Sequence, residues 1–221
     1  VSLACSPDLK QHLGGVLTFG GYTNWPEVMR WTLGSDPDGP SDSVNYPVVF
    51  KLLSQHWSET MADGQVDAQW NQYIRSTWNI DDLPAEDKRA MALDLAAPLS
   101  GDARQLFLQG CGQAQGWRAR AEDAILAARH LDWIDLRPKL EQLQVPLIAA
   151  HSSLDGISPT SESERLVAAC PPAIRARCHL TGMVGHSGES PTLSGLFLAL
   201  KELWTLRCIV SDAQWISTRP L

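Results

Sequence analysis

Apolar and polar residues are arranged along the chain in blocks that predict short strands separated by helices. The apolar run 16–19 lies between Gly14-Gly15 and Gly20-Gly21, which is typical of a buried strand between glycine breakers. Strand character returns over residues 145–150 and 176–183, and a loop rich in Gly, Ser or Asp follows each run. Because such strands alternate with helices, we expect an α/β fold with a parallel sheet covered on both faces.

The segments between and after these strands predict helices. Residues 26–140 have helical apolar spacing and no strand signal. Residues 161–169 predict a helix with Ser161 as N-cap and Glu164 at the capping-box position, and residues 190–211 predict a final helix with Pro191 in its first turn. Three strands alone leave both sheet edges open, so we expect further strands upstream of Val1.

Composition and charge narrow the class of protein. The 221 residues are 44% hydrophobic and 19% charged, as in a globular domain with or without an inserted subdomain. A net charge of -7 and the lack of clustered Lys and Arg in the sequence argue against a nucleic-acid footprint. The longest apolar stretch, 193–210, contains Lys201, Glu202 and Arg207, so we interpret it as an amphipathic helix and not a stable membrane span.

Five scattered cysteines lack a C-x-x-C pair and predict reduced, mostly buried thiols instead of a disulfide framework. We favour a cytoplasmic location, although nothing in the sequence identifies the compartment. The histidines show no metal-ligand spacing, so we expect neither a metal site nor a cofactor.

Titratable residues follow two of the predicted strands. The loop 151–159 carries Asp155, and the loop 183–188 carries His186 between glycines. The carboxyl ends of parallel strands meet at one edge of a sheet, where ligands and catalytic groups collect. An aspartate there can fix the tautomer of an imidazole and stabilise its charged form, which lets the other ring nitrogen act as a base.

These residues carry a resemblance to the α/β-hydrolase family. Residues 145–187 resemble its pattern of a strand, an H-G-x-x-D-x-x-x-P loop, a helix and a strand that ends in a Gly-His turn. Asp155 matches the family's acid and His186 its histidine, whereas Ser152 departs from the usual Gly. The resemblance implies a core of residues 1–25 and 141–221, the carboxyl-terminal part of the fold, with residues 26–140 as a helical cap. Residues 1–5 would belong to the helix after the family's nucleophile elbow.

The resemblance implies a serine hydrolase of esterase or lipase type that acts on a small-molecule carboxylic ester. His186 would be the general base and acid, and Asp155 would orient it. The G-x-S-x-G elbow is missing from the sequence, and Ser41 in the nearest approximation lacks both the final Gly and a preceding strand. We therefore expect the serine outside this chain, and expect the chain alone to be inactive.

Other interpretations stay open. A non-catalytic binding protein could retain the same fold, and a nucleotide-binding α/β domain would need a phosphate-cradling loop that the sequence lacks. We expect His151 to be packed and not a ligand, and residues 110–116 to connect two helices because their glycine spacing does not fit a dinucleotide motif. Five tryptophans are either core residues or the lining of an acyl pocket: Trp25, Trp31, Trp57, Trp70 and Trp78.

Overall fold

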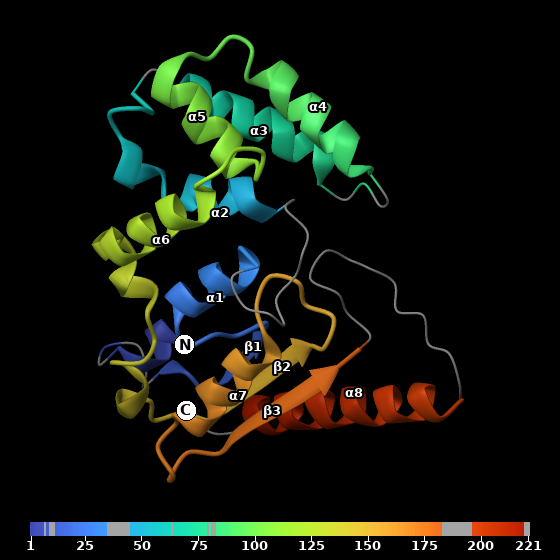
Figure 1. Cartoon of the computed structure of the whole chain (residues 1–221). Coiled ribbons are helices and arrows are strands. Elements are labelled where there is room, and N and C mark those ends of the chain that lie inside the picture. Colours follow the sequence, from blue (N-terminus) through green and yellow to red (C-terminus); the bar gives the residue numbers. More distant parts are fainter. Residues whose placement is uncertain are drawn as a thin grey trace. The chain divides into compact units, whose positions relative to one another are not determined.

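The computed structural model describes residues 1–6, 8, 12–34, 45–62, 64–78, 80, 83–182 and 196–218. The chain divides into two compact units. One combines Val1–Val28 with Leu131–Leu221 and contains the sheet, and the other is the helical unit Met29–His130 (Figure 1).

A three-stranded parallel sheet organises the first unit, as the apolar runs predicted. The strands are β1 (Val16–Phe19), β2 (Leu147–Ser152) and β3 (Ala176–Thr181), in the order β1-β2-β3. β2 begins after Pro146, which has no N–H to give to the ladder but whose carbonyl accepts from Val16 N. The α/β class and the parallel sheet are therefore confirmed.

Helices cover the two faces of this sheet. The face that carries Leu147 and Ala149 packs with Leu166 of α7 (Thr160–Ala168), and with residues of the 3₁₀ helices η1 (Ser2–Cys5) and η6 (Leu140–Gln142). Successive side chains of a strand point to opposite faces of the sheet, so Ile148 and Ala150 point away from α7. The helix α8 (Leu196–Ser217) contacts β2 and β3 and covers this other face. β2 lies between both layers, and Leu147 through Ala150 are fully buried.

A buried carboxylate joins α8 to β3. Asp212 accepts from His179 Nε2 at 2.9 Å and from the guanidinium groups of Arg175 and Arg177. Burial raises the pKa of Asp212, but the bond from His179 and the charges of the two arginines outweigh it and leave this pKa below its usual value. Trp215 lies under the Arg175 guanidinium at 4.0 Å. The ion network thus fixes the register of α8 against β3.

The second unit is helical, as predicted for this part of the chain. Its core contains Trp70, Tyr73, Phe50 and Phe107, and Trp70 Nε1 donates to Phe107 O at 3.2 Å. Its helices are α2 (Tyr46–Leu52), η4 (Ser54–Trp57), α3 (Gln65–Thr77), α4 (Ala85–Leu95), α5 (Gly101–Gly110) and α6 (Trp117–Ala127). Two helices cross the boundaries between the units, α1 (Trp25–Thr32) and η5 (Arg129–Ile134).

Several boundaries differ from the sequence predictions. The strand predicted over 145–150 begins and ends two residues later, as β2 (Leu147–Ser152), so His151 belongs to the strand and not to the loop. The predicted N-cap Ser161 is wrong, because the helix already begins at Thr160 and Pro159 precedes it without a side-chain cap. The final helix extends to Ser217, beyond the predicted 211, since Asp212 bonds to β3 on its last turns, and its predicted start at Ser190 lies outside the described residues. Residues 2–5 form a 3₁₀ turn and not an α-helix. None of the described helices is long and apolar enough to cross a bilayer.

We predict that Gly110→Ala destabilises the helical unit. A Cβ at this position would lie 2.7 Å from the rigid indole ring of Trp70, so the core would have to shift at a cost of about 1–3 kcal/mol. Denaturant unfolding measures the change. Gly156→Ala is the matched control, because its Cβ would meet nothing within 4 Å, and we expect a change below about 0.5 kcal/mol. Equal stability of the two variants would contradict this description of the core.

Candidate functional site

The carboxyl ends of β1 and β2 bring Gly20 and Asp155 together. Gly20 N donates to Ala150 O at 2.9 Å, and its φ of +61° lies in the left-handed region that favours glycine. A Cβ on Gly20 would lie 3.5 Å from Asp155 Oδ2, so the backbone of the β1 turn lies against the carboxylate. The predicted acid therefore lies at the sheet edge where catalytic groups collect.

The loop after β2 holds the Asp155 side chain in a fixed orientation. Asp155 Oδ1 accepts from the backbone N–H groups of Ile157 at 2.8 Å and Ser158 at 3.1 Å. Ser152, the residue that departs from the family pattern, accepts from Leu154 N through its Oγ at 3.0 Å. The Asp155 side chain is only 3% exposed. The serine thus closes the turn that precedes Asp155.

His151 is a buried partner of Asp155, as expected for a packed histidine. Its Nδ1 lies 2.6 Å from Ser163 Oγ, and its Nε2 lies 3.0 Å from Ser158 O and 3.3 Å from Asp155 Oδ2. Both neighbours of Nε2 are acceptors, so Nε2 carries a hydrogen. Ser163 Oγ donates in turn to Gly21 O at 2.8 Å, which connects the ends of β1 and β2 through α7.

A cavity of about 420 Å³ opens at the carboxyl end of β1. Gly20 lines this cavity as well as contacting Asp155. The lining side chains are apolar or uncharged and include Phe19, Tyr22, Trp133 and Leu166. Burial raises the pKa of the Tyr22 phenol, which stays neutral at physiological pH. The cavity therefore suits an uncharged, partly apolar ligand.

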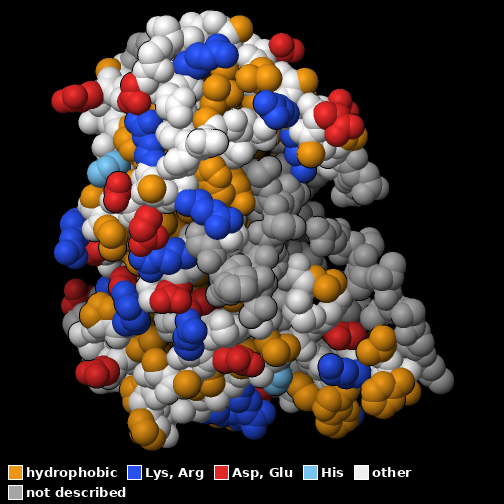
Figure 2. All heavy atoms as spheres, viewed as in Figure 1, with side chains coloured by type: hydrophobic (Ala, Val, Ile, Leu, Met, Phe, Trp, Pro, Cys, Tyr) orange, Lys and Arg blue, Asp and Glu red, His pale blue; other side chains and the backbone are white. Residues whose placement is uncertain are grey.

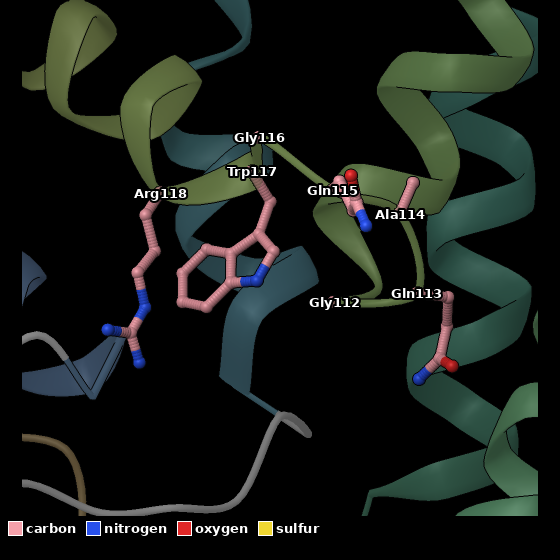
Figure 3. Close-up of a pocket in the computed structure, with 7 residues that line it drawn as sticks. All are labelled: Gly112, Gln113, Ala114, Gln115, Gly116, Trp117 and Arg118. Atoms are coloured by element: carbon pink, nitrogen blue, oxygen red, sulfur yellow. The ribbon is translucent and has the colours of Figure 1, made fainter.

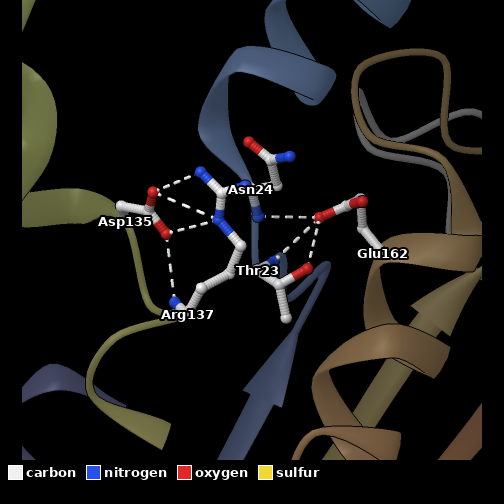
Figure 4. Close-up of polar contacts among 5 residues, drawn as sticks. All are labelled: Thr23, Asn24, Asp135, Arg137 and Glu162. Carbon is white, nitrogen blue, oxygen red and sulfur yellow. Dashed lines mark hydrogen bonds and ion pairs between the residues drawn. The ribbon is translucent and has the colours of Figure 1, made fainter.

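A second buried carboxylate, Glu162 of α7, fixes the chain between β1 and α1. Its Oε2 accepts from Thr23 N at 2.9 Å, Thr23 Oγ1 at 2.7 Å and Asn24 N at 2.9 Å (Figure 4). Burial raises the pKa of Glu162, but the bonds from Asn24, Thr23 and Arg165 outweigh it and lower this pKa below its ordinary value. Glu162 therefore acts as a charged clamp across 139 residues of sequence.

The segment 135–137 supports the same turn. Arg137 bonds to Asp135 through its guanidinium and its backbone N–H (Figure 4). Leu136 N donates to Thr23 O at 3.2 Å. The side-chain bond from Arg137 lowers the pKa of Asp135. Sequence reasoning missed Glu162 and this segment, because a single acid in a helix gives no sign of its distant partner.

The end of β3 is fixed by Glu202 of α8. Glu202 accepts from Thr181 Oγ1 at 2.7 Å and from Gly182 N at 3.0 Å. Ser153 N also donates to Thr181 O at 2.8 Å, which ties the loop after β2 to the end of β3. His186 and Ser41 lie outside the described residues.

The loop between α5 and α6 and the first residues of α6 line an open surface pocket of about 380 Å³ in the helical unit (Figure 3). Gly112 and Gly116 have positive φ values of 70° and 79°, and α6 begins at Trp117, whose ring lies 4.4 Å from that of Tyr46. The segment follows a helix and not a strand, so its interpretation as a helix connection is confirmed. Trp25, Trp57 and Trp70 are buried core residues.

The described part of the chain contains neither a cluster of metal ligands nor a reactive cysteine among its three buried thiols. No group of three or more His, Cys, Asp or Glu side chains there could hold a metal ion. The cysteines are free thiols, and Cys5, Cys111 and Cys170 are buried. Burial raises the pKa of each of these three, so they are unreactive as nucleophiles at neutral pH.

Comparison with models of known protein families, with curated proteins and with solved structures found no match to the chain. The functional argument therefore rests on the residues at the sheet edge.

We predict that Glu162→Gln destabilises the sheet unit in a pH-dependent way. The folded pKa lies below the ordinary value of 4.5, so the carboxylate's stabilisation is complete above that pH and is lost as pH falls through the folded pKa. We expect a loss of about 1–3 kcal/mol near pH 7, measured by denaturant unfolding between pH 3 and pH 7. The difference from wild type should shrink at the acid end.

The exposed Glu141 provides the matched control. Glu141→Gln should change the free energy of unfolding by less than about 0.5 kcal/mol at every pH. A Glu162→Gln effect that grows as the pH falls would show that the clamp does not depend on the charged carboxylate.

Proposed function

We propose that this chain contributes the acid and the histidine of a serine hydrolase that acts on carboxylic esters. Asp155 is the acid, His186 is the general base and acid, and the serine comes from outside residues 1–221. The observation that carries the proposal is the Asp155 carboxylate, which is shielded from solvent and fixed at the carboxyl edge of the sheet against Gly20.

The bonds of Asp155 suit an orienting role. Two backbone N–H groups fix Oδ1, and Oδ2 lies 3.3 Å from His151 Nε2. A carboxylate oxygen can accept more than one hydrogen bond. A carboxylate held in this way can fix the tautomer of an imidazole that approaches it.

The end of β3 supports His186 as the partner. Gly182 leaves the sheet beside the loop of Asp155, since Ser153 and Glu202 both bond to the last residues of β3. His186 follows Gly182 by four residues, which span at most about 14 Å when extended. The proposal places the imidazole within this reach, at the same sheet edge as Asp155.

The free edge of β1 supports a further strand that carries the serine. Within the described sheet β1 pairs with β2 only, and Val16 and Gly20 use their N–H groups toward β2, so the backbone groups of Leu17 and Phe19 point to the free edge. Phe19 is 67% exposed. A strand paired there would end beside Gly20 and the apolar cavity, where an acyl group can bind.

One observation favours the second candidate, a non-catalytic binding protein with the same fold. Asp155 contacts the buried His151, and this contact explains the buried carboxylate without any catalytic role. In that protein the cavity at β1 would bind an uncharged ligand, and the preceding sequence would lack G-x-S-x-G.

The experiment uses the protein expressed with the coding sequence that precedes Val1. We expect it to hydrolyse a short-chain p-nitrophenyl ester and to react with a fluorophosphonate probe. His186→Ala and Asp155→Asn should each lower kcat/KM by roughly 10³-fold or more, because each removes part of one proton-transfer unit.

His130→Ala and Asp94→Asn are matched controls, since both side chains are exposed in the helical unit. Their kcat/KM should stay within about twofold of wild type, a change of less than 0.5 kcal/mol. Unchanged hydrolysis by His186→Ala would refute the assignment. A protein without G-x-S-x-G that does not react with the probe but binds apolar esters would support the binding function instead.

A further inference from the structure

The outward side of α8 is apolar. The helix buries Glu202, Ile209 and Asp212 on the side that faces the sheet, while Phe197 and Trp204 are 81% and 62% exposed on the other. At 100° per residue, five of the six exposed apolar positions of α8 fall within an arc of about 140°, and Leu198 lies outside it on the side that faces the sheet. The five are Phe197, Leu200, Leu203, Trp204 and Val210, which we call the α8 outer face.

Figure 2 shows hydrophobic side chains gathered where α8 lies in Figure 1. A contiguous apolar surface on a helix that already packs its other side against a sheet is typical of an interaction site. The α8 outer face is therefore a candidate interaction surface.

The charges around this face have one sign. Lys201 and Arg207 are exposed, and the Arg207 guanidinium lies 5.3 Å from the Trp204 ring. The two carboxylates in the described helix, Glu202 and Asp212, turn inward to bond with residues of β3 and Gly182. The outer side of α8 thus combines apolar and positively charged side chains. The two acidic side chains of the helix, Glu202 and Asp212, lie on the side that faces the sheet.

We propose that the α8 outer face docks on the surface of an anionic lipid bilayer. Aromatic and leucine side chains insert at the boundary between headgroups and acyl chains, and long cationic side chains reach the lipid phosphates from the same depth. Trp is enriched at this boundary because its ring is amphipathic. The helix lies in the plane of the surface and does not cross the bilayer, which agrees with its length and hydropathy.

Charge complementarity selects this partner over a second copy of the chain. In a two-fold contact through α8, Arg207 and Lys201 would face their own copies, and no exposed carboxylate of the described helix would pair with them. An anionic bilayer supplies the missing negative charge. The proposal does not depend on the proposed hydrolase, since binding is measured without turnover.

The test is co-sedimentation of the 221-residue chain with vesicles of phosphatidylcholine and phosphatidylglycerol at 1:1, compared with phosphatidylcholine alone. We expect binding that favours the anionic vesicles and falls with added salt. The chain carries a net charge of -7, so its overall charge is repelled by anionic vesicles. Preferential binding to these vesicles would therefore come from a local positively charged surface.

Two double variants separate the contributions. Phe197→Ser/Trp204→Ser should lower the partition coefficient at least tenfold for both vesicle types. Lys201→Glu/Arg207→Glu should lower binding to the anionic vesicles by about fivefold or more for each charge and remove the preference for them. All substituted side chains are exposed, so thermal unfolding should be unchanged.

Arg75→Glu/Arg89→Glu is the matched charge control, since both arginines are exposed in the helical unit. It makes the same change in net charge and should retain the preference for anionic vesicles. Equal loss of binding in this control, or no vesicle binding by the wild-type chain, would overturn the proposal. A dimer that Phe197→Ser/Trp204→Ser converts to a monomer would also overturn it, because a second copy would then occupy the face.

Discussion

The structure of the sheet unit depends on the pairing of β2 with a parallel strand on each side. β2 is buried from Leu147 through His151, and its register sets Phe19 beside Ala150 and Ala150 beside His179. Parallel pairing sends all three strands in one direction, so the turns that follow them emerge at one edge. That constraint, and not any local motif, brings Gly20 to the Asp155 carboxylate and fixes Gly182 beside the loop that carries it.

Buried carboxylates then fix the elements around this edge, and each has a different environment. Glu162 accepts hydrogen bonds from Thr23 and Asn24 in the turn between β1 and α1, so its carboxylate stabilises that turn. Asp212 is paired with the guanidinium groups of Arg175 and Arg177 and is hydrogen-bonded to His179. Asp155 differs, because one oxygen is fixed by two backbone N–H groups while the other faces the imidazole of His151. Asp155 therefore has a fixed orientation at the sheet edge, which supports its proposed role toward His186.

Sequence patterns predicted the strands well, because apolar runs between Gly or Pro are local signals that tertiary structure reinforces. The helix at Thr160 was misplaced by one residue, since Ser161 resembles an N-cap while Pro159 already sets the entry. The burial of His151 agrees with its prediction as a packed residue, and Asp155 lies at the carboxyl end of β2 as its place in the sequence predicted. Glu162 and Glu202 were missed, because their partners are 139 and 21 residues away and hydropathy carries no information about such pairs. The apolar outer face of α8 was interpreted as an ordinary amphipathic helix, since sequence periodicity cannot tell which side the sheet covers.

The central claim is that Asp155 orients His186 in addition to contacting His151. Nitrogen-15 NMR of the histidine rings tests it without any nucleophile or substrate, with His151→Gln to assign the His151 signals. We expect His186 to hold a single tautomer, with the hydrogen on the nitrogen that faces Asp155, and Asp155→Asn to convert it to a mixture. A His186 spectrum that Asp155→Asn leaves unchanged, while the His151 signals shift, would show that Asp155 serves the structural pair alone.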